Sequence, residues 1–371
     1  MKKIAIIFQD VGATLQLVPI SQGFQGKNMD ILNLCSKRCG PILESRGLRF
    51  TELLRRGNKA DSLKEVHKQI VSFSPDIVLI GNSSQKNNLD QLVMEVSKSL
   101  DIPCCQFVDF WGEIRVSPPF PDAYITFDEI GYYSLTQREL TPVYCVDSPK
   151  HYEYCKLDLA ALRSLFFMKF PFLKSKIITS VFLQSEIYLP GHLKTISNFV
   201  EKIKEKLQGR AHKLLIKSHP SYPEDLERLK VKLSALNIEF VDVSDIPIEE
   251  VFSVTRYAAS CLSTCTIDFR YFCEYLGHEG IGIFLTFHPL ISQWLDRLGL
   301  KNRKEQITLS KNFYFLENLD DFDLSRHTPL KGEGTLLQTQ TILPVHQVYE
   351  VLKSFLIKRK ERAEKPSLHL L

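Results

Sequence analysis

The chain lacks the long apolar runs that would carry it into or across a membrane. No run in its 371 residues approaches the roughly 18 apolar residues that a spanning helix needs. The apolar start at residues 4–8 is too short for a signal peptide and runs into Gln9 and Asp10, so it predicts a buried strand instead. We therefore expect a cytoplasmic protein.

Several motifs that would fix a function are also absent. Neither G-x-G-x-x-G nor G-x-x-x-x-G-K-[ST] occurs, so we expect no dinucleotide or triphosphate in the N-terminal half. Neither G-x-S-x-G nor H-E-x-x-H occurs, which leaves no support for a protease. The nine cysteines form no paired C-x-x-C framework and predict buried free thiols and no metal site. A net charge of +4 is too small to make nucleic acid the main partner.

Short apolar runs alternating with helical patterns are present throughout, and they predict an α/β protein with parallel sheets. The length fits two domains. The clearest strand-like runs are residues 4–8, 48–53, 77–80, 104–108, 123–127 and 143–146, then 177–183, 214–216, 238–243, 257–262 and 282–287. We predict one Rossmann-like domain at 1–150, a linker at 151–176, a second Rossmann-like domain at 177–340, and a C-terminal helix with a basic tail at 341–371.

In the second half, polar clusters follow four predicted strands. These clusters are Gln184-Ser185-Glu186, Lys217-Ser218-His219-Pro220, Pro247-Ile248-Glu249 and Ser263-Thr264. Because open α/β sheets bind ligands at the carboxyl ends of their strands, we interpret the clusters as an anion site, with phosphate as the best fit. The competing interpretation is that these side chains only cap the helices that follow.

The order of these clusters resembles the donor domain of GT-B bacterial sialyltransferases and polysialyltransferases, which use a CMP-sugar. Lys217 and His219-Pro220 match the K-x-H-P motif of that family, Pro247 and Glu249 match its P-x-E, and Ser263-Thr264 stands where the family has a Ser-Ser pair. The resemblance covers about residues 177–277. It implies two Rossmann-like domains with a cleft between them and a nucleotide-sugar donor.

The resemblance also implies roles for these residues. Lys217, Ser263 and Thr264 would hold the donor phosphate, His219 would stabilise charge on the leaving group, and Glu249 would accept hydrogen bonds from ribose hydroxyls. We assign Gln184 and Ser185 to the donor site as well. No metal and no further cofactor is expected.

An inverting transfer also needs a base, and we expect it in the N-terminal half. Four strand-end acids qualify by position, namely Asp10, Asp109, Glu113 and Asp128. Asp128-Glu129-Ile130-Gly131 is similar to the acidic pair before a glycine in the sialyltransferases, with one extra residue. Asp109 is the rival, because Trp111 could offer a sugar an aromatic plane beside Arg115. We place Asp10, Trp111, Glu113 and Arg115 on the acceptor side and leave the base open between Asp109 and Asp128.

Together these features predict a metal-independent, inverting glycosyltransferase. It would move a CMP-activated nonulosonic acid (sialic, legionaminic or pseudaminic acid) or a Kdo-type sugar onto a surface polysaccharide or lipid-linked glycan. The alternatives are a UDP-sugar transferase or epimerase, a CDP-glycerol-type transferase, and a non-catalytic nucleotide- or glycan-binding protein of the same fold. The basic C-terminal helix could add peripheral contact with the inner membrane face.

Overall fold

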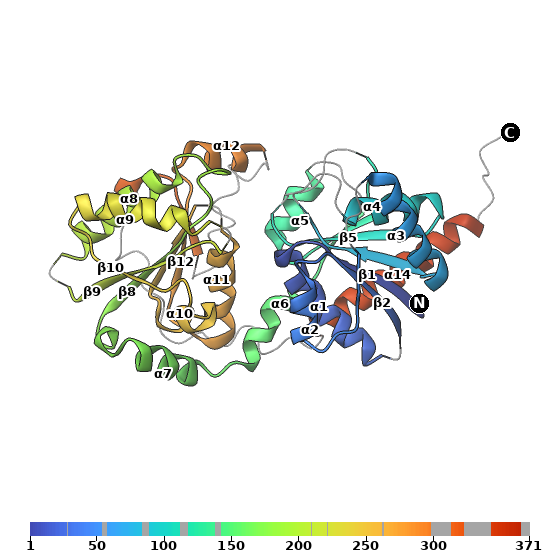
Figure 1. The fold of residues 1–371 in the computed structure, drawn as a ribbon, viewed down its shortest axis with the longest axis horizontal. Coiled ribbons are helices and arrows are strands. Elements are labelled where there is room, and N and C mark those ends of the chain that lie inside the picture. Colours follow the sequence, from blue (N-terminus) through green and yellow to red (C-terminus); the bar gives the residue numbers. More distant parts are fainter. Residues whose placement is uncertain are drawn as a thin grey trace. The chain divides into compact units, whose positions relative to one another are not determined.

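A computed structural model describes residues 1–27, 29–53, 58–83, 89–111, 118–137, 142–208, 210–220, 222–261, 263–297, 313–322 and 343–364. The chain divides into two compact units. Unit 1 comprises Met1–Tyr152 together with Gln340–Leu371, and unit 2 comprises Glu153–Thr339. Helices flank a parallel sheet in each unit (Figure 1).

The sheet of unit 1 is parallel throughout the described residues, with strand order β3-β2-β1-β4-β5-β6-β7. Its central strands are apolar on both faces, as expected for a sheet covered on both sides by helices. The strands are β1 (Lys3–Phe8), β2 (Asp30–Cys35), β3 (Thr51–Glu52), β4 (Ile77–Ile80), β5 (Cys104–Val108), β6 (Ala123–Thr126) and β7 (Val143–Cys145). The helices are α1 (Val11–Gln25), α2 (Gly40–Ser45), α3 (Lys59–Phe73), α4 (Leu89–Ser99), α5 (Glu129–Thr136), α6 (Pro149–Tyr152) and α14 (Pro344–Glu364).

The sheet of unit 2 is also parallel, with strand order β10-β9-β8-β11-β12-β13. Its strands are β8 (Ile177–Phe182), β9 (His212–Lys217), β10 (Phe240–Asp242), β11 (Tyr257–Ser260), β12 (Ile281–Leu285) and β13 (Phe313–Leu316). The α-helices are α7 (Leu159–Lys169), α8 (His192–Lys206), α9 (Glu224–Ala235), α10 (Ile248–Val254), α11 (Thr264–Leu276) and α12 (Pro289–Arg297). Short 3₁₀ turns are η1 (Glu153–Lys156), η2 (Pro171–Leu173) and η4 (Leu319–Asp321).

Both strand orders follow the Rossmann pattern, in which the chain starts at the centre, builds to one edge, and returns to build the other. The switch falls between β1 and β4 in unit 1 and between β8 and β11 in unit 2. The α/β prediction with two Rossmann-like domains is therefore confirmed. Side chains that follow these central strands lie where such folds bind ligands.

The structure corrects several details of the prediction. The segment 151–176 is not an irregular linker, because it forms η1, α7 and η2, and α7 packs against α10. Two strands were missed, β2 and β13, and the run at 48–53 pairs only over Thr51–Glu52. The C-terminal helix α14 returns to unit 1 and packs on α1, with Val348 and Leu352 fully buried.

Candidate functional site

The predicted donor residues lie in unit 2, after four strands that are neighbours in its sheet. Gln184 and Ser185 follow β8, Lys217 ends β9 and His219 follows it, Glu249 lies beyond β10, and Ser263 and Thr264 follow β11. These strands stand in the order β10-β9-β8-β11. Because all of them run parallel, the structure brings their carboxyl ends to one edge of the sheet.

Lys217 uses its ammonium group within the protein. Its Nζ donates hydrogen bonds to the carbonyl oxygens of Val243 (3.3 Å), Ser244 (2.7 Å) and Ile246 (2.6 Å). Partial burial lowers the pKa of Lys217, while nearby groups, Cys265 and Asp245 among them, act in the opposite direction. Lys217 therefore holds the loop between β10 and α10, the loop that leads to Glu249, and contributes positive charge to this edge of the sheet.

His219 belongs to a row of aromatic rings that the motif alone did not reveal. Its imidazole packs against the ring of Tyr222, with centroids 5.2 Å apart, and Tyr222 meets Tyr188 edge-on at 5.7 Å. Tyr188 is 76% exposed. Partial burial lowers the pKa of His219, which favours the neutral imidazole, and a neutral imidazole can donate one N–H. The row offers aromatic surface beside a hydrogen-bond donor.

Ser263 and Thr264 begin helix α11, the first helix after the central switch of the sheet. Ser263 is the N-cap residue, and its Oγ accepts from the backbone N–H of Cys265 (3.2 Å). A hydrogen bond between the hydroxyl groups of Ser260 and Thr266, whose oxygens lie 2.5 Å apart, stabilises this turn. Thr264 is partly exposed in the first turn. The 13 residues of α11 direct their dipole at this point, which favours an anion there.

Two adjacent glutamates at the start of α10 have different surroundings. Glu250 is buried and accepts from Lys169 of α7 at 2.7 and 3.0 Å. Glu249 is only partly buried and remains accessible at the edge of the sheet. Burial, followed by the charges of Asp268 and Glu249, raises the pKa of Tyr154. Tyr154 therefore lies near Glu249, although it comes from the segment that was predicted to be a linker.

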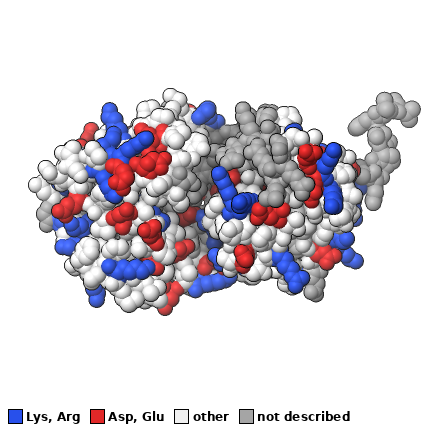
Figure 2. All heavy atoms as spheres, in the orientation of Figure 1, with Lys and Arg blue, Asp and Glu red and all other residues white. Residues whose placement is uncertain are grey.

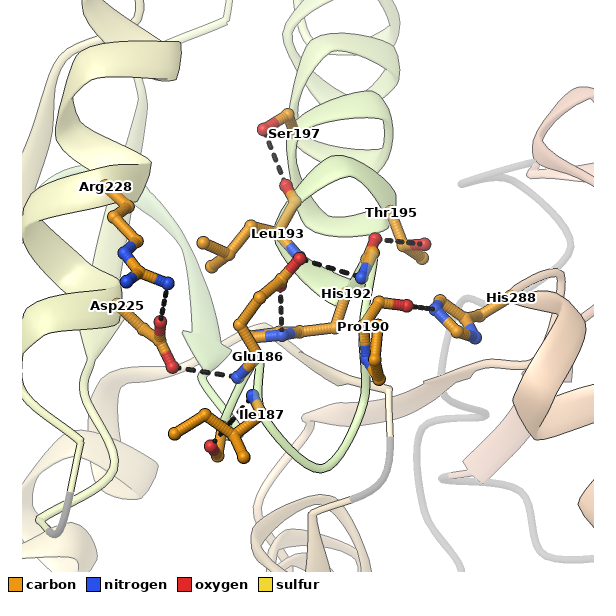
Figure 3. A network of polar contacts seen from close by, with 12 residues as sticks. Glu186, Ile187, Pro190, His192, Leu193, Thr195, Ser197, Asp225, Arg228 and His288 are labelled. Atoms are coloured by element: carbon orange, nitrogen blue, oxygen red, sulfur yellow. Dashed lines mark hydrogen bonds and ion pairs between the residues drawn. The ribbon is translucent and has the colours of Figure 1, made fainter.

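The loop after β8 is organised by Glu186 rather than by its two predicted neighbours (Figure 3). Glu186 Oε1 accepts from the backbone N–H of Gly191 (2.8 Å), and Oε2 accepts from that of Leu193 (3.1 Å) and lies 2.8 Å from His192 Nδ1. Burial alone would raise the pKa of Glu186, but these two N–H groups and His192 lower it. A carboxylate of the protein thus fills the anion position at the N-terminus of α8.

The two predicted residues beside Glu186 are not equally open. Ser185 is 1% exposed, and its Oγ accepts from the backbone N–H of Ile187 (3.1 Å), so it shapes the turn. Gln184 is partly exposed. Because Glu186 occupies the start of α8, the N-terminus of α11 is the better anion site of the two helices that flank the switch.

In unit 1, Asp10 and Asp109 lie near the start of α1. Asp10 is the N-cap residue of α1 without a side-chain cap hydrogen bond. Asp109 follows β5, and its Oδ2 lies only 2.7 Å from where a Cβ on Gly12 would be. Because Gly12 has no side chain, the Asp109 carboxylate can lie against the first turn of α1. Asp109 is partly exposed there.

Asp128 and Trp111 form a buried structural pair. Asp128 Oδ1 accepts from the backbone N–H of Gly131 (2.7 Å), which caps α5, and Oδ2 accepts from Trp111 Nε1 (2.8 Å). Trp111 is fully buried, so its ring has no open face for a sugar, and the prediction of a sugar platform is wrong. With both oxygens accepting hydrogen bonds, Asp128 fits the role of a cap better than that of a base. Glu113 and Arg115 lie outside the described residues.

Two kinds of feature are absent from the described residues. No group of three or more His, Cys, Asp or Glu side chains there could hold a metal ion. No helix there is long and apolar enough to cross a bilayer.

No protein family matches the chain, and no curated protein matches it. Several solved structures share its fold. UDP-GlcNAc 2-epimerase from Methanocaldococcus jannaschii in complex with UDP-GlcNAc and UDP superposes with a TM-score of 0.63 at 13% identity, covering 95% of this chain and 99% of that one. UDP-GlcNAc 2-epimerase from Neisseria meningitidis bound to UDP-GlcNAc superposes with a TM-score of 0.57 at 14% identity, covering 95% of this chain and 100% of that one. A glycosyltransferase from Rickettsia africae superposes with a TM-score of 0.57 at 10% identity, covering 96% of this chain and 93% of that one.

These likenesses show the fold, which is the GT-B type with two Rossmann-like domains. The broader part of the resemblance, a GT-B fold of the glycosyltransferase-like kind, is confirmed, and these three structures are two UDP-GlcNAc 2-epimerases and a glycosyltransferase rather than sialyltransferases.

Proposed function

We propose that the chain is a nucleotide-sugar enzyme that binds the nucleotide in unit 2. One observation carries the proposal: the N-terminus of α11, the imidazole of His219 and the accessible carboxylate of Glu249 follow β11, β9 and β10 of one parallel sheet, at the edge where its strands end. Phosphate would lie at α11, and Glu249 would accept from ribose hydroxyls. His219 would donate its N–H to a phosphate oxygen.

The favoured substrate is a UDP-sugar, and the favoured reaction is epimerisation of its sugar. The support is the likeness in fold to epimerases solved with UDP-GlcNAc bound, which extends over nearly the whole chain. Transfer of a CMP-activated nonulosonic acid is the second candidate, and it rests on the three motifs around His219, Glu249 and Ser263.

Both reactions have two requirements. The first is stabilisation of the negative charge that develops on the phosphate, and the second is a base that accepts a proton. In this proposal α11 and His219 supply the first. For the second, Asp109 is the candidate that unit 1 offers, because it is partly exposed at the start of α1 whereas Asp128 is buried and holds Trp111 and the cap of α5.

Nucleotide choice can be tested by thermal shift of the full chain with UDP, CMP and CDP. A ligand that binds only the folded protein raises its melting temperature. At a free ligand concentration of 100 times Kd, it adds about 2.7 kcal/mol to the free energy of unfolding. We expect UDP to stabilise more than CMP, and Glu249→Gln to reduce that gain. A larger effect of CMP would favour the second candidate, and no effect of any of the three would contradict the proposal.

The reaction can be identified by proton NMR after incubation with UDP-GlcNAc. An epimerase gives a second UDP-sugar, a transferase or hydrolase gives free UDP, and a non-catalytic binding protein gives neither. His219→Ala should lower the rate by two or more orders of magnitude, roughly as removal of a phosphate-stabilising donor does. Unchanged turnover in this folded variant would remove His219 from the site.

A further inference from the structure

Helix α7 is held to unit 2 through one side. Phe166 is fully buried, Arg163 Nε donates to the carbonyl of Ser253 (2.8 Å), and Lys169 pairs with Glu250 at 2.7 Å. The 3₁₀ turn η2 follows directly and buries Leu173. The helix and the turn are thus a fixed part of the unit.

The opposite side of the same segment is apolar and exposed. Leu165 is 42% exposed, Met168 is 68% exposed and Phe172 is 58% exposed. A spacing of three residues places Leu165 and Met168 on one side of α7, and Phe172 lies in η2, just beyond the end of the helix. Ala161 and Ser164, also exposed, extend the same side toward the start of α7 without adding charge. We call Leu165 and Met168 of α7, together with Phe172 of η2, the outer face of α7.

The charge around the outer face is mainly positive. Residues 159–176 contain Arg163, Lys169, Lys174 and Lys176 and no acidic residue, and the nearest acid in the sequence, the exposed Asp158, caps the start of α7. Lys174 and Lys176 are exposed, and within the described part of the chain no carboxylate lies within ion-pair distance of either. Figure 2 shows mostly uncharged surface along the lower edge of unit 2, where Figure 1 places α7, with Lys or Arg side chains and some Asp or Glu among it.

We propose that the outer face of α7 docks on an anionic lipid bilayer. Leu165, Met168 and Phe172 would enter the boundary between head groups and acyl chains, while Lys174 and Lys176 would meet negatively charged head groups. The combination of exposed apolar side chains with the nearby cations of Lys174 and Lys176 fits such a surface. A second copy fits less well, because a twofold contact through this face would bring the Lys174 and Lys176 of both copies together.

The C-terminal helix is a weaker place for such contact. Its apolar residues Val348 and Leu352 are fully buried, and Tyr349 meets Phe24 of α1 edge-on at 5.9 Å. Unit 1 therefore covers the apolar side of α14 over Val348–Leu352 and leaves Ile357 exposed (49%) farther along the helix, whereas three large apolar side chains are open together on the outer face of α7.

Co-sedimentation of the full chain with vesicles tests the proposal. The vesicles would be phosphatidylcholine alone, or phosphatidylcholine and phosphatidylglycerol in equal amounts. We expect the wild type to bind the mixed vesicles and to be released by salt. The double variant Met168→Asp/Phe172→Asp should bind at least about tenfold less, because it places charge where apolar side chains enter the lipid.

Three controls make the result decisive. Val231→Asp alters a residue of α9 that is 73% exposed and should leave binding unchanged. Lys174→Glu/Lys176→Glu changes only exposed side chains, so it reports on charge even if the first variant is poorly folded, and it should also weaken binding. Lys358→Glu/Lys360→Glu on α14 should have little effect. Equal binding to uncharged vesicles, loss only in the α14 variant, or an α7-dependent dimer that ignores vesicles would overturn the proposal.

Discussion

Lys217 Nζ donates a 2.6 Å hydrogen bond to the carbonyl oxygen of Ile246, two residues before α10 begins. Two further carbonyls, of Val243 and Ser244, share the same ammonium group. The lysine of the K-x-H-P motif thus fixes the loop that leads to Glu249. If Glu249 binds ribose, Lys217 acts on the nucleotide largely through that loop.

Replacing Lys217 with methionine tests this relationship. The variant keeps the unbranched, apolar stem of the side chain but leaves three carbonyls without their donor, which should lower the free energy of unfolding by about 2 kcal/mol. Nucleotide affinity should fall as well, because the loop before Glu249 loses its support. Denaturant unfolding and a nucleotide titration measure the two effects. Weakened binding with wild-type stability would show instead that Lys217 contacts the ligand directly.

Glu186→Gln tests the carboxylate that fills the start of α8. A glutamine has one oxygen where Glu186 uses two, so one of the N–H groups of Gly191 and Leu193 loses its acceptor. We expect a loss of about 1–2 kcal/mol in the free energy of unfolding. Glu201→Gln, an exposed site on the same helix, is the matched control and should change stability little.

The pH dependence of the Glu186 contribution follows from the direction of its shift. Because its pKa is lowered in the folded protein, the contribution is complete above the usual pKa of a glutamate and is lost as the pH falls through the folded value. The wild type and Glu186→Gln should therefore converge in stability in acid. A difference that persisted unchanged at low pH would contradict the charge-based account.

His278 should make unit 2 sensitive to pH over a higher range. Its Nε2 donates to the carbonyl of Thr255 (2.7 Å), and its Nδ1 faces Arg163 Nη2 at 2.9 Å, so the ring is held neutral. Burial lowers the pKa of His278 from its usual 6.5 to about 4. The unfolded chain therefore binds more protons between these values, and stability should decrease as pH falls from about 6.5 toward 4.

The size of the His278 effect is measurable by denaturant unfolding across that range. A shift of this size corresponds to roughly 3 kcal/mol. His278→Asn should be less stable at neutral pH and should show a smaller dependence on pH. Because burial also lowers the pKa of His212 to about 4, some dependence should remain in the variant. An identical slope in both proteins would exclude His278 as a source.

The sequence predicted the strand ends well because that information is local. Apolar runs ending in polar clusters place Lys217, Glu249 and Ser263 after parallel strands without any knowledge of tertiary contacts. It could not predict which side chains are engaged within the protein itself. Lys217 reaches carbonyls 26 to 29 residues away, and Asp128 is paired with Trp111 across 17 residues. Tyr154 lies near Glu249 only because its segment folds onto α11.

Gly12→Ala tests the role of Asp109 without touching the aspartate. An alanine Cβ at position 12 would lie 2.7 Å from Asp109 Oδ2, and because this atom is the end of a side chain it can turn away at small cost. Alanine also favours the helical backbone of α1 over glycine by up to about 1 kcal/mol. The variant should therefore fold with wild-type or slightly higher stability while its Asp109 carboxylate is displaced.

If Asp109 is the base of the proposed reaction, Gly12→Ala should lower kcat at least about tenfold, since a displacement near 1 Å in a catalytic group can cost more than that. Nucleotide binding in unit 2 should be unaffected, which separates this effect from loss of the substrate site. Gly26→Ala is the matched control, because a Cβ there would meet only the carbonyl of Gly23 at 3.5 Å, an ordinary contact. Full activity of Gly12→Ala would argue against Asp109 and would return Asp10, the N-cap residue of the same helix, as the next candidate.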